Sequence, residues 1–416
     1  MSIQFSTTGS EFLYKRKFNK YEGNIHLIIN YYFMLGIYIH IPFCVKKCNY
    51  CDFCSFSMNQ FSSGFSSQYI KALVKEILDS PADLQKEKVD SVYIGGGTPS
   101  ILKSGQIEEI LETLNKKFYV EKNAEITIEA NPGTVNKEKL QALKRMGIDR
   151  LSLGIQSLND NNLKTLGRIH NSKAAIETYE LCRNLNFGSI NLDFIFAIPG
   201  QTLKGWMEEA NRITKLAPDH VSTYCLTPEP ETPLGDSILE GITEEMHEVD
   251  VVEIMNSTHQ FFEDAGYSHY EISNYSKPGH ESRHNLKYWQ LENFLGFGIS
   301  AYSYKDGWRF GNTDDLEEYI GIVQQNGRPV KFAEKLCVNR QMGEFVMMAL
   351  RTARGVETGK FKTRFDKNLN EVFPDQFQHL LEKGWLQEIT EGAMTRYCIP
   401  WSYFAIQNEI AGEFIV

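Results

Sequence analysis

Short apolar strands alternate with amphipathic helices along the first half of the chain, and this alternation limits the folds that the chain can adopt. Because a strand, a helix and a second strand form a right-handed unit with parallel strands, the pattern predicts an α/β fold. Six such units, recurring roughly every thirty to forty residues, predict an incomplete (β/α)6 barrel of the TIM type, whose chemistry gathers at the carboxyl ends of its strands. The six strands are predicted at residues 37–41, 90–94, 124–130, 150–157, 189–196 and 220–226.

Four cysteines stand close together directly after the first strand. The strand ends at Pro42, and Cys44, Cys48, Cys51 and Cys54 follow within eleven residues of loop. The spacing of the first three places three thiolates on one tight turn, where they can ligate three corners of a cubane iron-sulfur cluster. Thiolates also suit zinc and Cu(I), but zinc sites usually combine cysteine pairs from separate parts of a chain. The spacing therefore favours iron-sulfur over zinc, and ordinary free thiols are the third interpretation.

Glycines and polar residues recur where the later strands end. Residues 95–98 (Gly-Gly-Gly-Thr) follow the second strand, and Glu129 and Gln156 end the third and fourth. Asp193 lies along the fifth strand and Cys225 near the end of the sixth. Consecutive glycines let a backbone approach a ligand and present its amides, with a plain tight turn as the alternative. Each polar residue alone is explained by capping or loop hydrogen bonds, but their recurrence at successive strand ends predicts one ligand site.

The cysteine motif has a recognisable form. Tyr38-x-His-x-Pro-Phe-Cys44-x3-Cys48-x2-Cys51 resembles the cluster motif of the radical SAM superfamily, and its lead-in resembles the oxygen-independent coproporphyrinogen III oxidase branch. The resemblance implies that Cys44, Cys48 and Cys51 hold a [4Fe-4S] cluster whose open iron chelates S-adenosylmethionine (SAM). Cys54 lies one position later than the fourth cysteine of the oxidases, so the resemblance leaves open whether it is a ligand or a bystander.

The resemblance also implies a set of residues that contact SAM. The oxidase branch divides these positions between two SAM molecules, and the number bound here is left open. No residue is assigned a catalytic role. The matching positions are Tyr38, Tyr50, Gly96, Gly97, Thr98, Glu129, Gln156, Arg168, Asp193 and Cys225.

A second motif lies beyond the barrel pattern. His284 stands beside Tyr288 and Trp289, an arrangement that can ligate a heme iron and stack on a porphyrin face, although a histidine among aromatics is more often structural. The sequence His284-Asn-x-x-Tyr288-Trp289 resembles the signature of the heme chaperones of the same branch. That resemblance makes His284 the expected heme ligand.

Two functions follow from these resemblances. The first is a heme chaperone on a radical SAM scaffold, which binds heme or porphyrin, receives electrons from a low-potential donor and transfers heme to an acceptor protein. The second is an oxygen-independent coproporphyrinogen III oxidase, which forms protoporphyrinogen IX by radical oxidative decarboxylation. The displaced Cys54, the His284 motif and a short segment before the cluster favour the chaperone. A zinc-stabilised binding protein without redox chemistry is the third class.

Four regions are expected along the chain. Residues 1–33 are interpreted as an extension upstream of a start at Met34, and no function is assigned to them. Residues 34–239 form the partial barrel, and residues 240–328 close it and bind heme or substrate. A composition change at residues 326–329 suggests a linker, so residues 329–416 are expected to form a C-terminal winged-helix-like α+β domain.

Charge and cysteine usage exclude some classes. Lysine and arginine number 43 against 53 aspartates and glutamates, which gives a net charge of −10 and no long basic run, so nucleic acid is not an expected partner. The four remaining cysteines are scattered singly, which fits a reducing, cytoplasmic location. The apolar stretch 25–43 is interrupted by polar residues and supplies the first strand, so no stable membrane insertion is expected.

Overall fold

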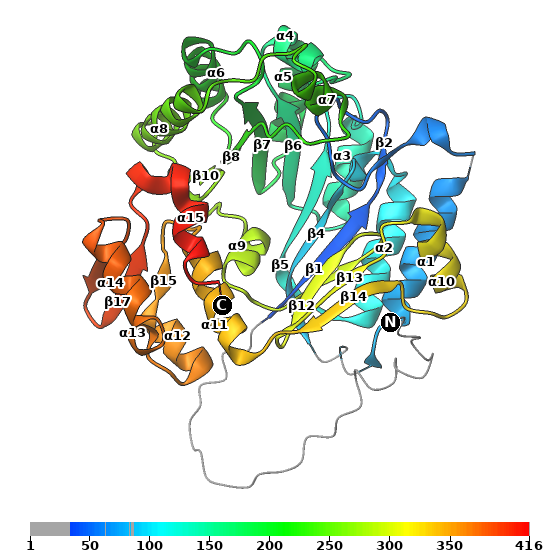
Figure 1. Cartoon of the computed structure of the whole chain (residues 1–416). Helices are drawn as coiled ribbons and strands as arrows, with labels where there is room; N and C mark the ends of the chain where they lie inside the picture. Colours follow the sequence, from blue (N-terminus) through cyan, green and yellow to red (C-terminus); the bar gives the residue numbers. More distant parts are fainter. Residues whose placement is uncertain (1–33, 63, 83, 85–86, 416) are drawn as a thin grey trace, which may run out of the picture.

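The computed structural model describes residues 34–415 apart from 63, 83, 85 and 86, so the expected extension 1–33 lies outside the described residues. A twelve-stranded sheet forms the centre of the molecule, in the order β14-β13-β12-β11-β1-β4-β5-β6-β7-β8-β10-β9 (Figure 1). Its six central strands are parallel, which confirms the predicted barrel strands. These strands are β1 (Leu35–Ile41), β4 (Lys88–Gly96), β5 (Tyr119–Ala130), β6 (Arg150–Gln156), β7 (Ser189–Phe196) and β8 (His220–Cys225).

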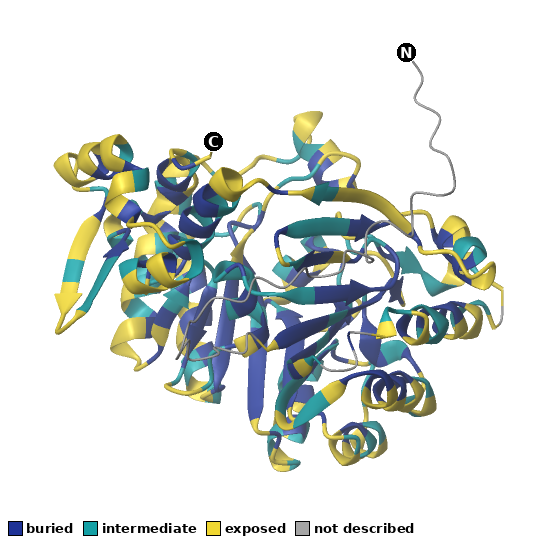
Figure 2. Ribbon diagram, turned by 90° about the horizontal axis from the view of Figure 1, so that it is seen from below, coloured by how far each residue is buried: buried dark blue, intermediate teal, exposed yellow. Residues whose placement is uncertain are grey.

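Helices cover one face of this sheet, and the main apolar core lies between the two layers (Figures 1 and 2). Because side chains alternate along a strand, Ile37, Ile39 and Ile41 of β1 all point into this core and are fully buried. Figure 2 shows buried strands at the centre and, beside them, helices whose outer surfaces are exposed. The covering helices are α1 (Phe65–Leu78), α2 (Ser104–Lys117), α3 (Lys137–Arg145), α4 (Asp160–Thr165), α5 (Ser172–Asn184) and α6 (Leu203–Leu216).

The alternate positions of the central strands place polar side chains on the other face, which we call the lumen face. A TIM barrel usually fills this space with branched aliphatic side chains. Here the side chains hydrogen-bond to one another from strand to strand. The lumen face includes Ser91, Tyr93, Glu129, Ser152, Asn191, Asp193, His220 and Ser222.

Six further strands extend the two edges of the six parallel strands. Beside β1 lie β11 (Phe294–Phe297), β12 (Tyr302–Lys305), β13 (Trp308–Asn312) and β14 (Val330–Lys335), while β10 (Asn274–Ser276) and β9 (Ser268–Glu271) follow β8. β11 ends at Phe297, because Gly298 and Ser300 have positive φ angles of 103° and 54° and turn the chain into β12. β11 runs parallel to β1 and widens the sheet at that edge.

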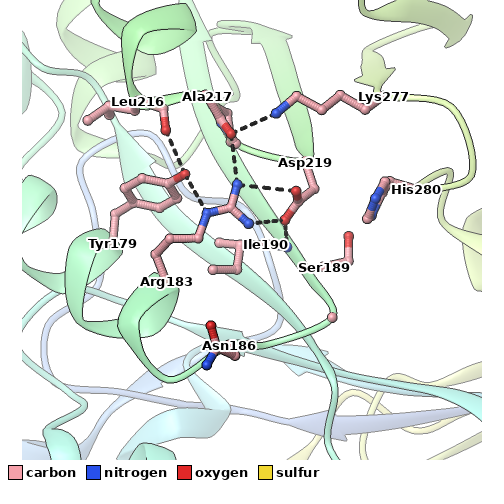
Figure 3. A network of polar contacts seen from close by, with 12 residues as sticks. Tyr179, Arg183, Asn186, Ser189, Ile190, Leu216, Ala217, Asp219, Lys277 and His280 are labelled. Carbon is pink, nitrogen blue, oxygen red and sulfur yellow. Dashed lines mark hydrogen bonds and ion pairs between the residues drawn. The ribbon is translucent and has the colours of Figure 1, made fainter.

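An ion pair between Arg183 and Asp219 links the start of β8 to its neighbours (Figure 3). Arg183 on α5 donates to both carboxylate oxygens of Asp219, at 2.7 and 3.2 Å, and to the carbonyl oxygen of Ala217 at 2.7 Å. Tyr179 accepts from Arg183 Nε at 3.1 Å, and Lys277 donates to the same Ala217 carbonyl at 2.8 Å. The contacts thereby join α5, the start of β8 and the residue that follows β10.

Four further helices belong to this part of the molecule: α7 (Pro233–Leu239), α8 (Glu248–Asp264), α9 (Arg283–Trp289) and α10 (Leu316–Gln324). α8 begins at Glu248, after the extended residue His247. α8 packs against α6, where the indole of Trp206 donates to Thr258 Oγ1 at 2.7 Å. Within the described residues, every helix is too short or too polar to cross a membrane.

The C-terminal part has its own apolar core and lies to one side of the sheet, in orange and red in Figure 1. It confirms the expected α+β composition. Because β14 pairs with β13 of the main sheet, we propose that this domain begins after Lys335 rather than at residue 329. Its elements are α11 (Val338–Ala349), β15 (Val356–Glu357), α12 (Thr358–Phe365), α13 (Leu369–Val372), α14 (Pro374–Glu382), β16 (Gln387–Glu391), β17 (Met394–Cys398) and α15 (Gln407–Gly412).

Candidate functional site

The cysteine loop is held at both ends. Two short parallel strands, β2 (Phe43–Cys44) and β3 (Phe56–Ser57), pair across it. His40 Nε2 donates to the carbonyl oxygen of Cys54 at 2.8 Å, so its Nδ1 is left to accept from Tyr38 at 3.0 Å. The histidine of the motif therefore fixes the far end of the loop, a role that the sequence did not reveal.

Two of the motif cysteines are joined by a chain of three hydrogen-bonding side chains. Thr98 Oγ1 donates to Cys44 Sγ at 3.5 Å, and Arg168 Nη1 donates to Cys48 Sγ at 3.3 Å. Asn131 connects these two donors, because its amide nitrogen donates to Thr98 at 2.9 Å and its oxygen accepts from Arg168 at 2.7 Å. We call Thr98, Asn131 and Arg168 the sulfur bracket. The sulfur bracket connects the cysteine loop to the ends of β4 and β5 and to the segment after α4.

The donor set fits thiolate ligands. A thiolate accepts hydrogen bonds, and the bracket directs one donor at Cys44 and one at Cys48. Burial raises the pKa of the Cys44 and Cys51 thiols, while the Thr98 hydroxyl lowers that of Cys44. In residues 34–415, without the four gaps, no three histidine, cysteine or acidic side chains converge on a single metal position. Ligation of a cluster by the three thiols stays a prediction, which the arrangement of donors fits.

Cys54 has different surroundings. Its Sγ faces the carbonyl oxygen of Asp314 at 3.9 Å, and neither Thr98 nor Arg168 donates to it. Burial raises the pKa of its thiol, and the Asp314 carboxylate adds to that effect.

The glycine loop lies against the cysteine loop. The amides of Gly97 and Thr98 donate to the carbonyl oxygens of Ile41 and Phe43, each at 2.8 Å, and Gly96 N donates to Glu129 Oε2 at 3.0 Å. These three amides are therefore engaged within the protein, and the expectation that the loop presents amides to a ligand is wrong for them. The expected close approach is present, since a Cβ on Gly97 would lie 2.7 Å from the Phe43 oxygen.

Two carboxylates lie at the same end of the sheet. Tyr93 donates to Glu129 at 2.9 Å, and burial together with the charge of Asp193 raises the pKa of Glu129 to about 8. Asp193 accepts from Ser152 at 2.9 Å and from Asn191 at 2.7 Å. Acidic oxygens here can accept from the ammonium or hydroxyl groups of a bound ligand.

The other predicted SAM-contact residues lie at this end of the sheet, which we call the rim. Tyr50 is close enough to Arg168 and Asp193 for their charges to affect its pKa, which burial raises. Tyr38 stacks on Tyr93 with ring centres 6.3 Å apart. Gln156 ends β6 with φ at 69°, and Cys225 is exposed at the end of β8. The structure thus brings the predicted positions to one end of the sheet, and contact of any of them with SAM stays a prediction.

His284, the predicted heme ligand, has different surroundings from the predicted SAM contacts. It lies on α9 and is completely buried against β4, with Nδ1 3.0 Å from Ser91 Oγ and Nε2 2.8 Å from the Tyr288 hydroxyl. Its ring stacks on Tyr93, and burial lowers its pKa to about 3. Both ring nitrogens therefore have partners inside the protein, and heme ligation by His284 stays a prediction that requires Nε2 to exchange Tyr288 for iron.

Sequence reasoning missed three residues that the structure places at or below the site: Asn131, Asn191 and His220. Asn191 and His220 lie on the lumen face at two-residue intervals from Asp193 and Ser222. A period of two in polar residues along a buried strand is the signal that would have found them. Asn131 follows β5 directly and had no such pattern.

The chain has relatives along most of its length. The radical SAM superfamily matches residues 38–213, and the HemN C-terminal domain matches residues 339–393. The heme chaperone HemW of Bacillus subtilis (strain 168) is 34% identical over 386 residues, which cover 92% of this chain and 99% of that protein. HemW of Escherichia coli (strain K12) is 32% identical, with coverage of 86% and 93%.

Two further comparisons extend this result. The Danio rerio protein named radical S-adenosyl methionine domain-containing protein 1, mitochondrial, is 30% identical over 81% of this chain and 78% of its own length. The solved structure of coproporphyrinogen III oxidase (HemN) from Escherichia coli, a radical SAM enzyme, has a TM-score of 0.80 at 22% identity, covers 92% of this chain and 90% of its own, and shows the fold. The chain therefore belongs to the radical SAM superfamily and, within it, to the HemW family.

Proposed function

We propose that this chain is a heme chaperone on a radical SAM scaffold, which binds one [4Fe-4S] cluster, SAM and heme and passes the heme to an acceptor protein. The observation that carries the proposal is the sulfur bracket, because it aims donors at two of the three motif cysteines. Relatives named heme chaperone HemW, matched over nearly their whole length, support the heme part of the proposal.

The side chains at the rim divide the work of binding. Cys44, Cys48 and Cys51 supply the thiolates, and Thr98 and Arg168 donate to two of their sulfurs. When bound, a cluster with an open iron supplies an electron to SAM. The Glu129 and Asp193 carboxylates, and others of the ten matching positions, would hold SAM beside the cysteine loop. A low-potential electron donor and a heme-acceptor protein are the partners that this function requires, and we place it in the cytoplasm.

Heme binding is assigned to the His284 motif. Nε2 becomes available to iron only when its hydrogen bond to Tyr288 is given up. Trp289 is also engaged, because it donates a hydrogen bond to the buried carboxyl of Glu271. Heme binding at this motif would therefore include a local movement of α9.

Anaerobic reconstitution tests the cluster. Cys44→Ala, Cys48→Ala and Cys51→Ala are each expected to remove most iron and acid-labile sulfide, because each thiolate would hold one of the three irons that the protein ligates. Cys54→Ala is the matched control and is expected to keep both. A protein that takes up one zinc ion per chain and no iron would contradict the proposal.

Turnover and transfer assays test the function. Reduced protein is incubated anaerobically with SAM and coproporphyrinogen III, and no protoporphyrinogen IX is expected. Its appearance would establish the oxidase instead. Heme-loaded protein is then mixed with an apo-form of a heme protein, and a shift of the Soret band to that of the acceptor is the expected result. Heme that stays on the chain, or leaves it equally fast without an acceptor, would contradict the chaperone.

A further inference from the structure

A second chain of hydrogen bonds lies on the lumen face below the rim, and the proposed site does not account for it. Its first link is Asp193, which is partly exposed and accepts from Asn191 Nδ2 at 2.7 Å. Asn191 Oδ1 lies 2.7 Å from His220 Nδ1, and His220 Nε2 lies 2.7 Å from the Tyr270 hydroxyl. Tyr270 in turn accepts from the backbone amide of Ser282 at 3.2 Å.

The hydrogen bonds of this second chain all run in one direction. A carboxylate only accepts, so Asn191 must present its NH2 group to Asp193 and its oxygen to His220. That oxygen also only accepts, so His220 must carry its proton on Nδ1 and leave Nε2 as an acceptor for the Tyr270 hydroxyl. The Tyr270 oxygen then accepts from Ser282. Each link therefore fixes the orientation of the next, and every donor points toward the carboxylate.

Other lumen residues reinforce this direction. Ser222 Oγ donates to Asn191 Oδ1 at 3.1 Å, and Asn191 Nδ2 lies 2.8 Å from Ser152 Oγ. Ser152 donates to the second oxygen of Asp193 at 2.9 Å. Burial raises the pKa of Asp193 and these hydrogen bonds oppose the rise. His220 and Asn191 are themselves buried, so water cannot replace a lost link without rearrangement.

We propose that Asn191, His220 and Tyr270 are positioning residues for Asp193. They hold its carboxylate oriented toward the ligand at the rim, and they link it to the residue that caps α9. Ser282 is the N-cap of α9, and its hydroxyl accepts from Asn285 N at 3.3 Å. The proposal rests on the proposed function in one respect, namely that Asp193 contacts SAM.

Measurements of SAM affinity in anaerobically reconstituted protein test the role of this hydrogen-bond chain. His220→Phe removes both ring nitrogens and is expected to weaken SAM binding by up to about tenfold, the upper end of what one lost neutral hydrogen bond contributes. His220→Asn keeps a donor where Nδ1 was and is expected to recover most of that loss. Tyr270→Phe removes one hydroxyl only and is expected to weaken binding about twofold to fivefold.

His269→Phe is the matched control. His269 is a buried imidazole on β9 that donates to the carbonyl oxygen of Ile272 and has no bond to the chain. Its substitution is expected to leave SAM affinity unchanged even if stability falls. Equal SAM affinity in wild type and His220→Phe would overturn the proposal, and so would equal losses in His220→Phe and His269→Phe.

A spectroscopic measurement separates this proposal from the function on which it rests. In 15N-histidine NMR spectra, His220 is expected to show the Nδ1-H tautomer in the absence of SAM and to stay neutral over the pH range in which exposed histidines titrate. An Nε2-H tautomer overturns the proposed direction whether or not SAM binds. A wild-type protein that binds no SAM overturns the proposed function and the role of the chain at the rim together, while the tautomer still decides the direction of the chain.

Discussion

A glycine can be required in a loop for its backbone freedom or because another segment packs closely against it. Substitution of Gly97 by alanine distinguishes these two reasons. A Cβ on Gly97 would lie 2.7 Å from the Phe43 carbonyl oxygen and 3.0 Å from Cys44 Sγ. The first distance is 0.7 Å shorter than the 3.4 Å at which ordinary contact begins. The φ angle of Gly97 is not positive, so the effect is steric. One of the two loops must therefore move.

Such a movement affects stability and cysteine geometry together. Overpacking in a closely packed region costs about 1–3 kcal/mol, and we expect the free energy of unfolding to fall by that amount. The displaced atoms include the carbonyl oxygen that accepts from Thr98 N and the sulfur that accepts from Thr98 Oγ1, so we also expect less iron per chain after reconstitution.

The measurements are urea unfolding of the apo-protein and iron and sulfide content after anaerobic reconstitution. Gly105→Ala on α2 is the control, because no atom lies within 4 Å of its added Cβ. Alanine favours helix over glycine by up to about 1 kcal/mol, so this variant is expected to be unchanged or slightly more stable and to load iron normally. Wild-type stability and iron content in Gly97→Ala would refute the steric argument.

Three further predictions follow from buried polar groups. Tyr288→Phe removes the partner of His284 Nε2 and is expected to raise heme affinity severalfold, whereas His284→Ala abolishes the Soret shift; equal spectra in the two variants would exclude His284 as ligand. Burial raises the pKa of Glu76 from 4.5 to about 7, so its contribution to stability is complete below pH 4.5 and is lost as the pH rises through about 7. The wild-type free energy of unfolding should therefore fall by roughly 3 kcal/mol relative to Glu76→Gln over that range, and parallel pH profiles would contradict the assignment. Lys287→Met leaves Asp90 and Glu292 without their shared cation and is expected to cost about 3 kcal/mol in urea unfolding, while an unchanged midpoint would show that these carboxylates are solvated.

The strands and helices of the barrel were predictable because each one has a strong local signal. The apolar alternation of β1 ends before Pro42, and β6, β7 and β8 begin at residues 150, 189 and 220, as expected from the sequence. The neighbours of β1 were not predictable in the same way. β11 lies far along the chain from β1, and a pattern within one strand carries no information about a partner so distant. For the same reason, β14 was assigned to the C-terminal domain, after the expected linker at residues 326–329. In the structure these residues connect α10 to β14, which pairs with β13 of the main sheet.

The candidate site shows a similar division. The three cysteines and the glycine loop could be found from spacing, because a metal motif and a triple glycine are local features. Asn131 could not, since its role arises only when the ends of β4 and β5 and the segment after α4 meet. His284 was expected to ligate heme because its motif resembles the signature of the heme chaperones. The structure uses one of those neighbours, Tyr288, to satisfy its second ring nitrogen.

The polar lumen face has a thermodynamic consequence for the whole barrel. Exposure of apolar surface on unfolding raises the heat capacity, and exposure of polar surface lowers it. Ser91, Ser152, Asn191 and His220 occupy positions that aliphatic side chains fill in a closed barrel. The heat-capacity increment of this domain should therefore be smaller than that of an aliphatic-filled barrel of equal length, and its stability should change less steeply on cooling and on warming.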